Sequence, residues 1–264
     1  MISVVCVYNK KEILENYLLK SLKNQTTGFE LILLDNRQRK FKSAAEAFNY
    51  GGEKAKGNYI MFVHQDIDLC SNSWLEEAEK FMDKLPNLGI AGIAGASEEG
   101  IITNIKHGIP SSPAGDIYIT TPKEVQTLDE CLIIIPKSIF NLLKFDEKVC
   151  NDWHLYAVDY CLSIKNLGYH VFVLPMYAYH LSSGLPPKSK LRKMVDLGPL
   201  PKSYYKTLRK VAKKHKSHFR KIYTTCGNWN TLLPLALQRI GIFKLLFKIV
   251  LPFEIISLPI SQIE

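Results

Sequence analysis

The chain has 264 residues, of which 47% are hydrophobic and 22% charged, which is ordinary for a globular protein with a substantial core. The six cysteines are scattered and form no CxxC pair, which argues against a zinc site built from them and for free, mostly buried thiols. Met1 leads directly into a strand-like run without the basic segment or cleavage site of a secretory signal. The sequence therefore predicts a cytoplasmic protein.

The net charge of +9 is unevenly distributed along the chain. The segment from Lys188 to Lys221 holds 13 basic residues and one acid, Asp196, so that it carries +12 and leaves −3 for the rest. Such a segment predicts an affinity for phosphates, whether in nucleic acid, on an anionic membrane surface or on a phosphorylated substrate.

Strands and helices are expected to alternate through the first third of the chain. Short apolar and β-branched runs predict strands at 2–8, 29–35 and 59–64. Apolar or small residues at helical spacing predict helices at 11–24, 43–57 and 72–85, with Gly57 as a stop. This alternation predicts an α/β fold with a parallel sheet, in which a ligand lies beyond the carboxyl ends of the strands.

The chain after residue 88 is predicted to alternate less regularly between strands and helices. Strands are expected at 89–95 and 169–174, a polar loop region near 97–122, and a helix over 152–167 that ends at Gly168. A further helix is expected near 202–221. Residues 231–264 are apolar, but charges and prolines interrupt them, so no window offers the roughly 20 apolar residues of a spanning helix. They fit an interfacial element on a membrane, a helix docked on the domain, or a homodimer interface.

Acidic residues follow two of the predicted strands. Asp35 ends the strand at 29–35, and Asp66 and Asp68 come directly after the strand at 59–64. Two carboxylates one residue apart beyond a buried strand suit Mg²⁺ or Mn²⁺, which take oxygen ligands and bridge to phosphates. A solvated loop is the plainer alternative for this pair. Asp35 either accepts the N–H of a base such as uracil or forms a strand-end turn.

Two further groups of residues are candidates for the site. His180 follows an apolar segment that could return beside the carboxylates, where imidazole would complete a mixed metal shell; a purely structural histidine is the alternative. On the predicted helix, Asp152, Tyr156 and Asp159 share one face, where aromatic surroundings could tune a carboxylate for proton abstraction. A helix cap is the other role open to Asp152.

Several motifs together resemble the family 2 glycosyltransferases of the GT-A fold. They are SVVCVYN, ELILLDN and GNYIMFVHQDIDL, then FDEKVCNDWHLYAVDYCLSIKNLGYHVFVLP and YHLSSG. The resemblance covers roughly residues 2–184. It implies a Rossmann-like, mixed but mostly parallel sheet flanked by helices, with a nucleotide-binding half at 1–96 and an acceptor half at 97–184. A basic and apolar helical extension at 185–264 would follow.

The same resemblance implies the chemistry of the site. The donor would be a nucleotide sugar, expected as a UDP-sugar, and the acceptor a glycan or lipid-linked molecule in cell-surface polysaccharide or glycoconjugate synthesis. Mn²⁺ or Mg²⁺ would neutralise the leaving diphosphate in a single displacement that inverts the anomeric carbon. The implied nucleotide-binding residues are Tyr8, Asp35, Asn49 and Asp66, and the implied metal ligands are Asp66, Asp68 and His180. Membrane contact through 202–264 would bring a lipid-linked acceptor close.

One departure from the family concerns the catalytic base. Aligned through DYCL, the position at which many relatives carry the base is Ala157. The base is then expected among Asp159, Asp152 and His154, in that order.

Three alternatives to a glycosyltransferase stay open at this point. A nucleotidyltransferase would need a glycine-rich phosphate loop after the first strand, and VYNKKEILEN has none. A nucleic-acid-binding module acting through the basic segment leaves Asp35, Asp66 and Asp68 unexplained, so nucleic acid is not the expected partner. A non-catalytic relative would account for Ala157.

Overall fold

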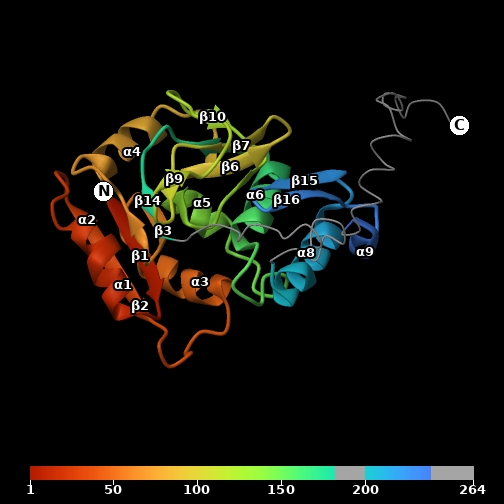
Figure 1. Ribbon diagram of the computed structural model, residues 1–264, viewed down its shortest axis with the longest axis horizontal. Coiled ribbons are helices and arrows are strands. Elements are labelled where there is room, and N and C mark those ends of the chain that lie inside the picture. Colours follow the sequence, from red (N-terminus) through yellow and green to blue (C-terminus); the bar gives the residue numbers. More distant parts are fainter. Residues whose placement is uncertain (182–199, 239–264) are drawn as a thin grey trace, which may run out of the picture.

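The computed structural model describes residues 1–181 and 200–238, and its centre is a seven-stranded sheet (Figure 1). The spatial order of the strands is β10 (Lys123–Glu124), β13 (His170–Val173), β5 (Leu88–Gly92), β12 (Leu132–Pro136), β3 (Tyr59–His64), β1 (Ile2–Tyr8) and β2 (Phe29–Asp35). Only β10 and β12 run antiparallel to their neighbours. The predicted mixed, mostly parallel α/β sheet is confirmed.

Helices cover both faces of this sheet (Figure 1). One apolar cluster holds the helical run α1 (Lys11–Leu14), η1 (Glu15–Leu19) and α2 (Lys20–Leu22) together with α4 (Trp74–Met82). The cluster on the other face holds α3 (Ala44–Lys54), α5 (Lys137–Leu142) and α6 (Tyr156–Asn166). In β1, Val4 and Cys6 belong to the first cluster and Val5 to the second. Burial on both faces explains why these strands are continuously apolar.

Three smaller sheets occupy parts of the chain for which loops or nothing regular was expected. The first joins β11 (Thr127–Leu128), β6 (Ala94–Ser97) and β7 (Gly100–Thr103), and the second joins β4 (Ile67–Asp68), β14 (Tyr179–His180), β8 (Lys106–His107) and β9 (Ser112–Pro113). The pairing of β14 with β4 matters most, because it places His180 opposite Ile67 and so brings the segment after β13 to the end of β3.

The helix predicted at 43–57 is shorter than expected. It begins after Ser43, whose hydroxyl accepts the N–H of Glu46, and it ends at Lys54. Gly57 is not its stop. Instead, a Cβ at this position would lie 2.6 Å from the carbonyl oxygen of Met1, so glycine allows the chain to pass close to the start of β1.

The helix predicted at 152–167 begins only at Tyr156. Leu155 has a left-handed backbone with φ 66°, which breaks the helical path before that point. The prediction that Asp152 and Asp159 share a helical face is therefore wrong. At the other end, Gly168 with φ 84° terminates the helix as expected.

The described part of the C-terminal region, residues 200–238, packs against the sheet domain beside α6. Helix α8 (Lys202–His215) packs Leu208 and Val211 into the same apolar cluster as α6, and the hairpin β15 (Lys221–Thr224) and β16 (Gly227–Asn230) was not predicted. A short helix, α9 (Leu235–Gln238), follows. Among the residues described, no helix is long and apolar enough to cross a membrane. The interfacial element expected near the C-terminus falls mainly on 239–264, outside the described residues.

Candidate active site

The strands β2, β1 and β3 end side by side at one edge of the sheet. Tyr8 at the end of β1 lies opposite Asp35 in β2, and Val7 lies opposite His64 in β3. Gln65 ties the loops that follow. Its side-chain oxygen accepts the N–H groups of Asn9 and Lys10 at 3.1 and 2.9 Å, while its amide donates to the Asn9 side chain. The carboxyl edge of the sheet is thus held in a fixed arrangement.

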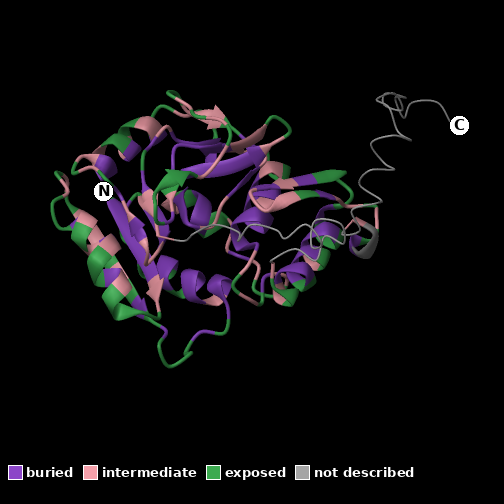
Figure 2. Ribbon diagram, in the orientation of Figure 1, coloured by how far each residue is buried: buried purple, intermediate pink, exposed green. Residues whose placement is uncertain are grey.

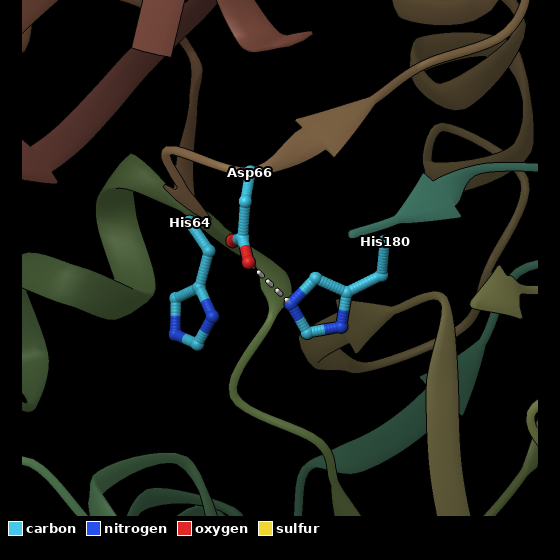
Figure 3. A group of neighbouring side chains, drawn as sticks. All are labelled: His64, Asp66 and His180. Atoms are coloured by element: carbon cyan, nitrogen blue, oxygen red, sulfur yellow. Dashed lines mark ion pairs between the residues drawn. The ribbon is translucent and has the colours of Figure 1, made fainter. Parts of the chain in front are cut away.

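Three side chains that could bind a cation meet at this edge: His64, Asp66 and His180 (Figure 3). Their ligand atoms lie within 4.8 Å of one another, and His180 Nε2 lies 3.3 Å from Asp66 Oδ2. Tyr156 supports the cluster from α6, because its hydroxyl donates to the carbonyl oxygen of Glu130 and lies 3.4 Å from His64 Nε2.

The charges within this cluster shift each other's protonation. Burial disfavours the Asp66 carboxylate, but the hydrogen bond from His180 and the charges of both histidines hold its pKa below the usual value. Burial likewise opposes the charged form of His180, and the bond to Asp66 overcomes this and raises the pKa of His180. For His64 burial dominates and lowers its pKa, so this imidazole is neutral and able to bind a metal.

The donor atoms of the cluster fit one of the two expected cations better than the other. One carboxylate and two imidazoles form a mixed oxygen and nitrogen set, whereas Mg²⁺ prefers oxygen ligands in octahedral geometry. His64, Asp66 and His180 are therefore the residues that would hold a divalent transition-metal ion here.

The structure does not bring Asp68 into this cluster. Its carboxylate accepts the N–H of Cys70 at 2.8 Å, and its backbone pairs with Tyr179 across β4 and β14. Of the expected ligands Asp66, Asp68 and His180, the structure brings Asp66 and His180 together, and His64 lies within reach of both. The role of Asp68 as a ligand stays a prediction.

A cavity of about 780 Å³ opens beside the cluster, a size usual for small-ligand sites. Its walls come from the strand ends, the loop between β2 and α3, and the segment before α6. The polar and aromatic lining residues are Tyr8, Asn9, Asn36, Arg39, Phe41, Lys42, Phe48, His64, Gln65, Asp66, Asp152, Trp153 and Tyr156. Two residues of the cluster, a basic loop and an acid next to an exposed tryptophan thus line one cavity.

Tyr8 and Asp35, the two residues expected to contact the nucleobase, line different cavities. Tyr8 lines the large cavity, whereas Asp35 lines a second hollow of about 660 Å³ with Arg37. The Arg37 guanidinium grips the Asp35 carboxylate, with Nη2 to Oδ2 at 2.6 Å, and these hydrogen bonds hold the pKa of Asp35 far below its usual value. Asp35 can accept a base N–H only if Arg37 moves.

Asn49 has a structural position rather than a place in the cavity. Its amide donates to the carbonyl oxygen of Phe145 and to Glu147, and its oxygen accepts the N–H of Phe145. The side chain is buried, and these bonds tie α3 to the loop after α5, so the structure does not bring Asn49 to the cavity with the other expected nucleotide-binding residue Tyr8.

The three candidates for the catalytic base lie in different environments in the structure. Asp159 is 2% exposed and lies 2.8 Å from both Lys214 Nζ and His215 Nε2, so it is enclosed between α6 and α8. His154 packs edge-on against Tyr204, and burial lowers its pKa. Only Asp152 lines the cavity. The expected order put Asp159 first because it lies closest to the DYCL motif, whereas the structure encloses Asp159 and places Asp152 in the cavity wall.

Several residues of the site were missed by the sequence analysis. His64 stands two positions before Asp66 in HQD, the spacing that puts side chains on one side of a strand, and that was the available signal. Asp129 in LDE accepts the Thr225 hydroxyl at 2.6 Å, and its charge acts on His180. Nothing in the sequence singled out Trp153 or the loop at 39–42, since their position depends on the folded chain.

Comparison with known protein families and solved structures agrees with a glycosyltransferase fold. A family model described as "Glycosyltransferase like family" matches residues 2–182, and no curated protein sequence matches. The Staphylococcus aureus TarS fragment 1–349 with UDP-GlcNAc superposes with a TM-score of 0.54 at 16% identity, covering 81% of this chain and 66% of that one.

Two further solved structures share the fold. GalNAc-T7 with UDP, GalNAc and Mn²⁺ has a TM-score of 0.54 at 12% identity, covering 80% of this chain and 47% of that one. The mannosyltransferase PcManGT from Pyrobaculum calidifontis, with GDP-Man and Mn²⁺, has a TM-score of 0.53 at 11% identity, covering 92% and 68%. The chain spans less than two thirds of the TarS fragments and of GalNAc-T7.

The strand order, the cation-binding cluster at the carboxyl edge and the family match lead to one assignment. The chain belongs to the glycosyltransferase family 2-like proteins and has the GT-A fold.

Proposed function

We propose that the protein transfers a sugar from a nucleoside diphosphate donor, a UDP-sugar, to a hydroxyl of a glycan or lipid-linked acceptor with inversion at the anomeric carbon. The observation that carries the proposal is the cluster of His64, Asp66 and His180 at the edge of a cavity of about 780 Å³. Solved relatives carrying UDP-GlcNAc, or UDP and GalNAc with Mn²⁺, support a UDP-sugar and manganese.

The charged residues that line the cavity indicate where the diphosphate of the donor would bind. Arg39 and Lys42 line the cavity from the loop between β2 and α3, and they supply positive charge for a diphosphate. Tyr8 offers an aromatic face at the end of β1. A divalent ion held by His64, Asp66 and His180 would neutralise charge on the leaving diphosphate. Asp35 would contact the base after release from Arg37.

The residues just before α6 indicate where the acceptor would bind. Asp152 lies in the cavity wall, and we assign it as the base that takes the proton of the acceptor hydroxyl. Its neighbour Trp153 is 38% exposed and lines the same cavity, so its indole can stack on a sugar ring. Asp152 and Trp153 thus line the same cavity as the basic loop, where an acceptor hydroxyl would meet the donor.

The wider role follows from this chemistry. The proposal places the enzyme in cell-surface polysaccharide or glycoconjugate synthesis, acting in the cytoplasm at the membrane face where lipid-linked acceptors lie. Dimerisation through the C-terminal extension is a further part of the proposal.

The test is a panel of nucleotide sugars with and without Mn²⁺, followed by thermal unfolding and by release of the nucleoside diphosphate. One donor class, expected to be the UDP-sugars, should raise the unfolding temperature only with Mn²⁺ present. Absence of stabilisation by every nucleoside diphosphate in the presence of Mn²⁺ would overturn the proposal. Stabilisation without turnover on any acceptor would instead favour a non-catalytic relative.

A further inference from the structure

Helix α8 uses one flank of basic residues to dock on the body of the protein. Its buried face, which includes Leu208 and Val211, packs with α6, and the outer side of the helix is exposed (Figure 2). Lys210 donates to Asn151 Oδ1 at 2.7 Å, and Lys214 lies 3.0 Å from an Asp146 oxygen and 2.8 Å from Asp159. These two lysines are four residues apart and so lie on one flank.

The exposed face of α8, next to these two lysines, carries further basic residues. Lys202, Lys206, Arg209 and Lys213 follow one another at intervals of four, three and four residues, which places them along one side of the helix. We call this set the basic stripe. All four are exposed, and within the described ranges 1–181 and 200–238 no carboxylate forms an ion pair with any of them.

The basic stripe is a concentrated positive surface that no carboxylate of the described residues pairs with. It extends about 16 Å along the helix, from the rise of 1.5 Å per residue. Helix α8 contains no acidic residue, so the like charges repel one another at neighbouring turns. Because the buried face of α8 lies on the other side of the helix, the four charges point away from the body and can meet an anionic partner.

We propose that the basic stripe binds the surface of a membrane that contains anionic lipids. Three of its four residues are lysines, which act as point charges toward a layer of headgroup phosphates rather than as bidentate forks. The aromatic residues of the helix, Tyr204 and Tyr205, are buried, so the stripe offers no surface on which nucleic acid bases could stack. The sequence at 239–264, outside the described residues, is mostly aliphatic and aromatic, which favours lipid over nucleic acid.

The experiment is sedimentation of the full chain with phosphatidylcholine vesicles that contain or lack phosphatidylglycerol, at low and at raised salt. The test variant replaces the basic stripe: Lys202→Gln, Lys206→Gln, Arg209→Gln and Lys213→Gln. The matched control removes the same charge elsewhere, from exposed lysines that do not line the cavity: Lys20→Gln, Lys23→Gln, Lys56→Gln and Lys84→Gln. Thermal unfolding checks that both variants remain folded.

The wild-type protein should bind only the vesicles with phosphatidylglycerol, and more weakly as salt rises. Because each basic residue near such a surface contributes about a fivefold gain, the stripe variant should lose at least about 100-fold in partitioning and the control far less. Equal binding by the stripe variant and wild type, equal loss in the control, or binding to neutral vesicles would overturn the inference. Tighter binding to a DNA duplex at the same salt would also do so. The inference rests on the membrane placement in the proposed function; since no donor is present in this experiment, failure here removes that placement and leaves the proposed sugar transfer standing.

Discussion

Asp159 Oδ1 lies 2.8 Å from His215 Nε2, and both side chains are almost completely buried between α6 and α8. Lys214 reaches the other carboxylate oxygen at 2.8 Å and also contacts Asp146, and these contacts raise the pKa of Lys214 against the effect of burial. One carboxylate thus joins the GT-A core to the C-terminal extension. An acid so placed is expected to act on stability and not on proton transfer.

Replacement of Asp159 tests this role. Asp159→Asn removes the buried carboxylate that accepts from His215 Nε2 and one of the two carboxylates that pair with Lys214, and breaking such a buried pair costs up to about 3–5 kcal/mol. Urea unfolding should show this loss, together with a lower unfolding temperature. A variant as stable as the wild type but inactive would restore Asp159 as a candidate base.

Replacement of Asp152 should lower turnover and leave the stability of the protein nearly unchanged, the reverse of the effect expected for Asp159. Asp152→Asn removes the carboxylate from the cavity wall, and loss of a general base lowers kcat by roughly 10²–10⁴-fold. Donor binding with Mn²⁺ and the free energy of unfolding should change little, because the side chain lies at the edge of the cavity. Single-turnover transfer at saturating donor measures the effect. The matched control is His154→Gln, in which turnover is expected to persist, and a fully active Asp152→Asn would exclude Asp152 as the base.

The sheet could be predicted from the sequence, because strands buried on both faces are continuously apolar and the helices between them are amphipathic. The position of Asp66 beyond β3 and the return of His180 to it were predicted as well. The shared helical face of Asp152 and Asp159 was predicted wrongly, since one left-handed residue, Leu155, moves the helix start to Tyr156 and separates the two acids. The hairpin β15–β16 was also missed: its strands carry mixed polar residues and gain their burial only by packing on the body.

The two carboxylates after β3 should differ in cation binding. Asp66→Asn removes the single carboxylate of the cluster with His64 and His180, so stabilisation by Mn²⁺ should be lost. Asp68→Asn changes a residue of the same type two positions away that only accepts the Cys70 N–H, and it should keep the stabilisation. Thermal unfolding over a series of Mn²⁺ concentrations compares the two variants. Loss in Asp68→Asn with retention in Asp66→Asn would reverse the assignment.

Glu130 should make the stability of the protein depend on pH. Its Oε1 is buried without a hydrogen-bond partner, and burial followed by the charge of Asp129 raises the pKa of Glu130 to about 8. A carboxyl whose pKa is higher in the folded state contributes stability below its ordinary value, and this contribution is lost as pH rises toward 8. Stability should therefore fall between about pH 4.5 and 8.

The variant Glu130→Gln isolates this contribution, because glutamine keeps the shape of the protonated acid without its titration. At pH 8 the variant should be more stable than the wild type by a few kcal/mol, about 1.4 kcal/mol per unit of pKa difference, and at pH 4 the two should be alike. Urea unfolding across this range measures the difference. Asp129→Asn is the contrast, since burial opposes the Asp129 carboxylate but the Thr225 hydroxyl and the Cys131 N–H hold its pKa below the usual value. A pH profile of Glu130→Gln parallel to that of the wild type would show that Glu130 is ionised in the folded protein at neutral pH.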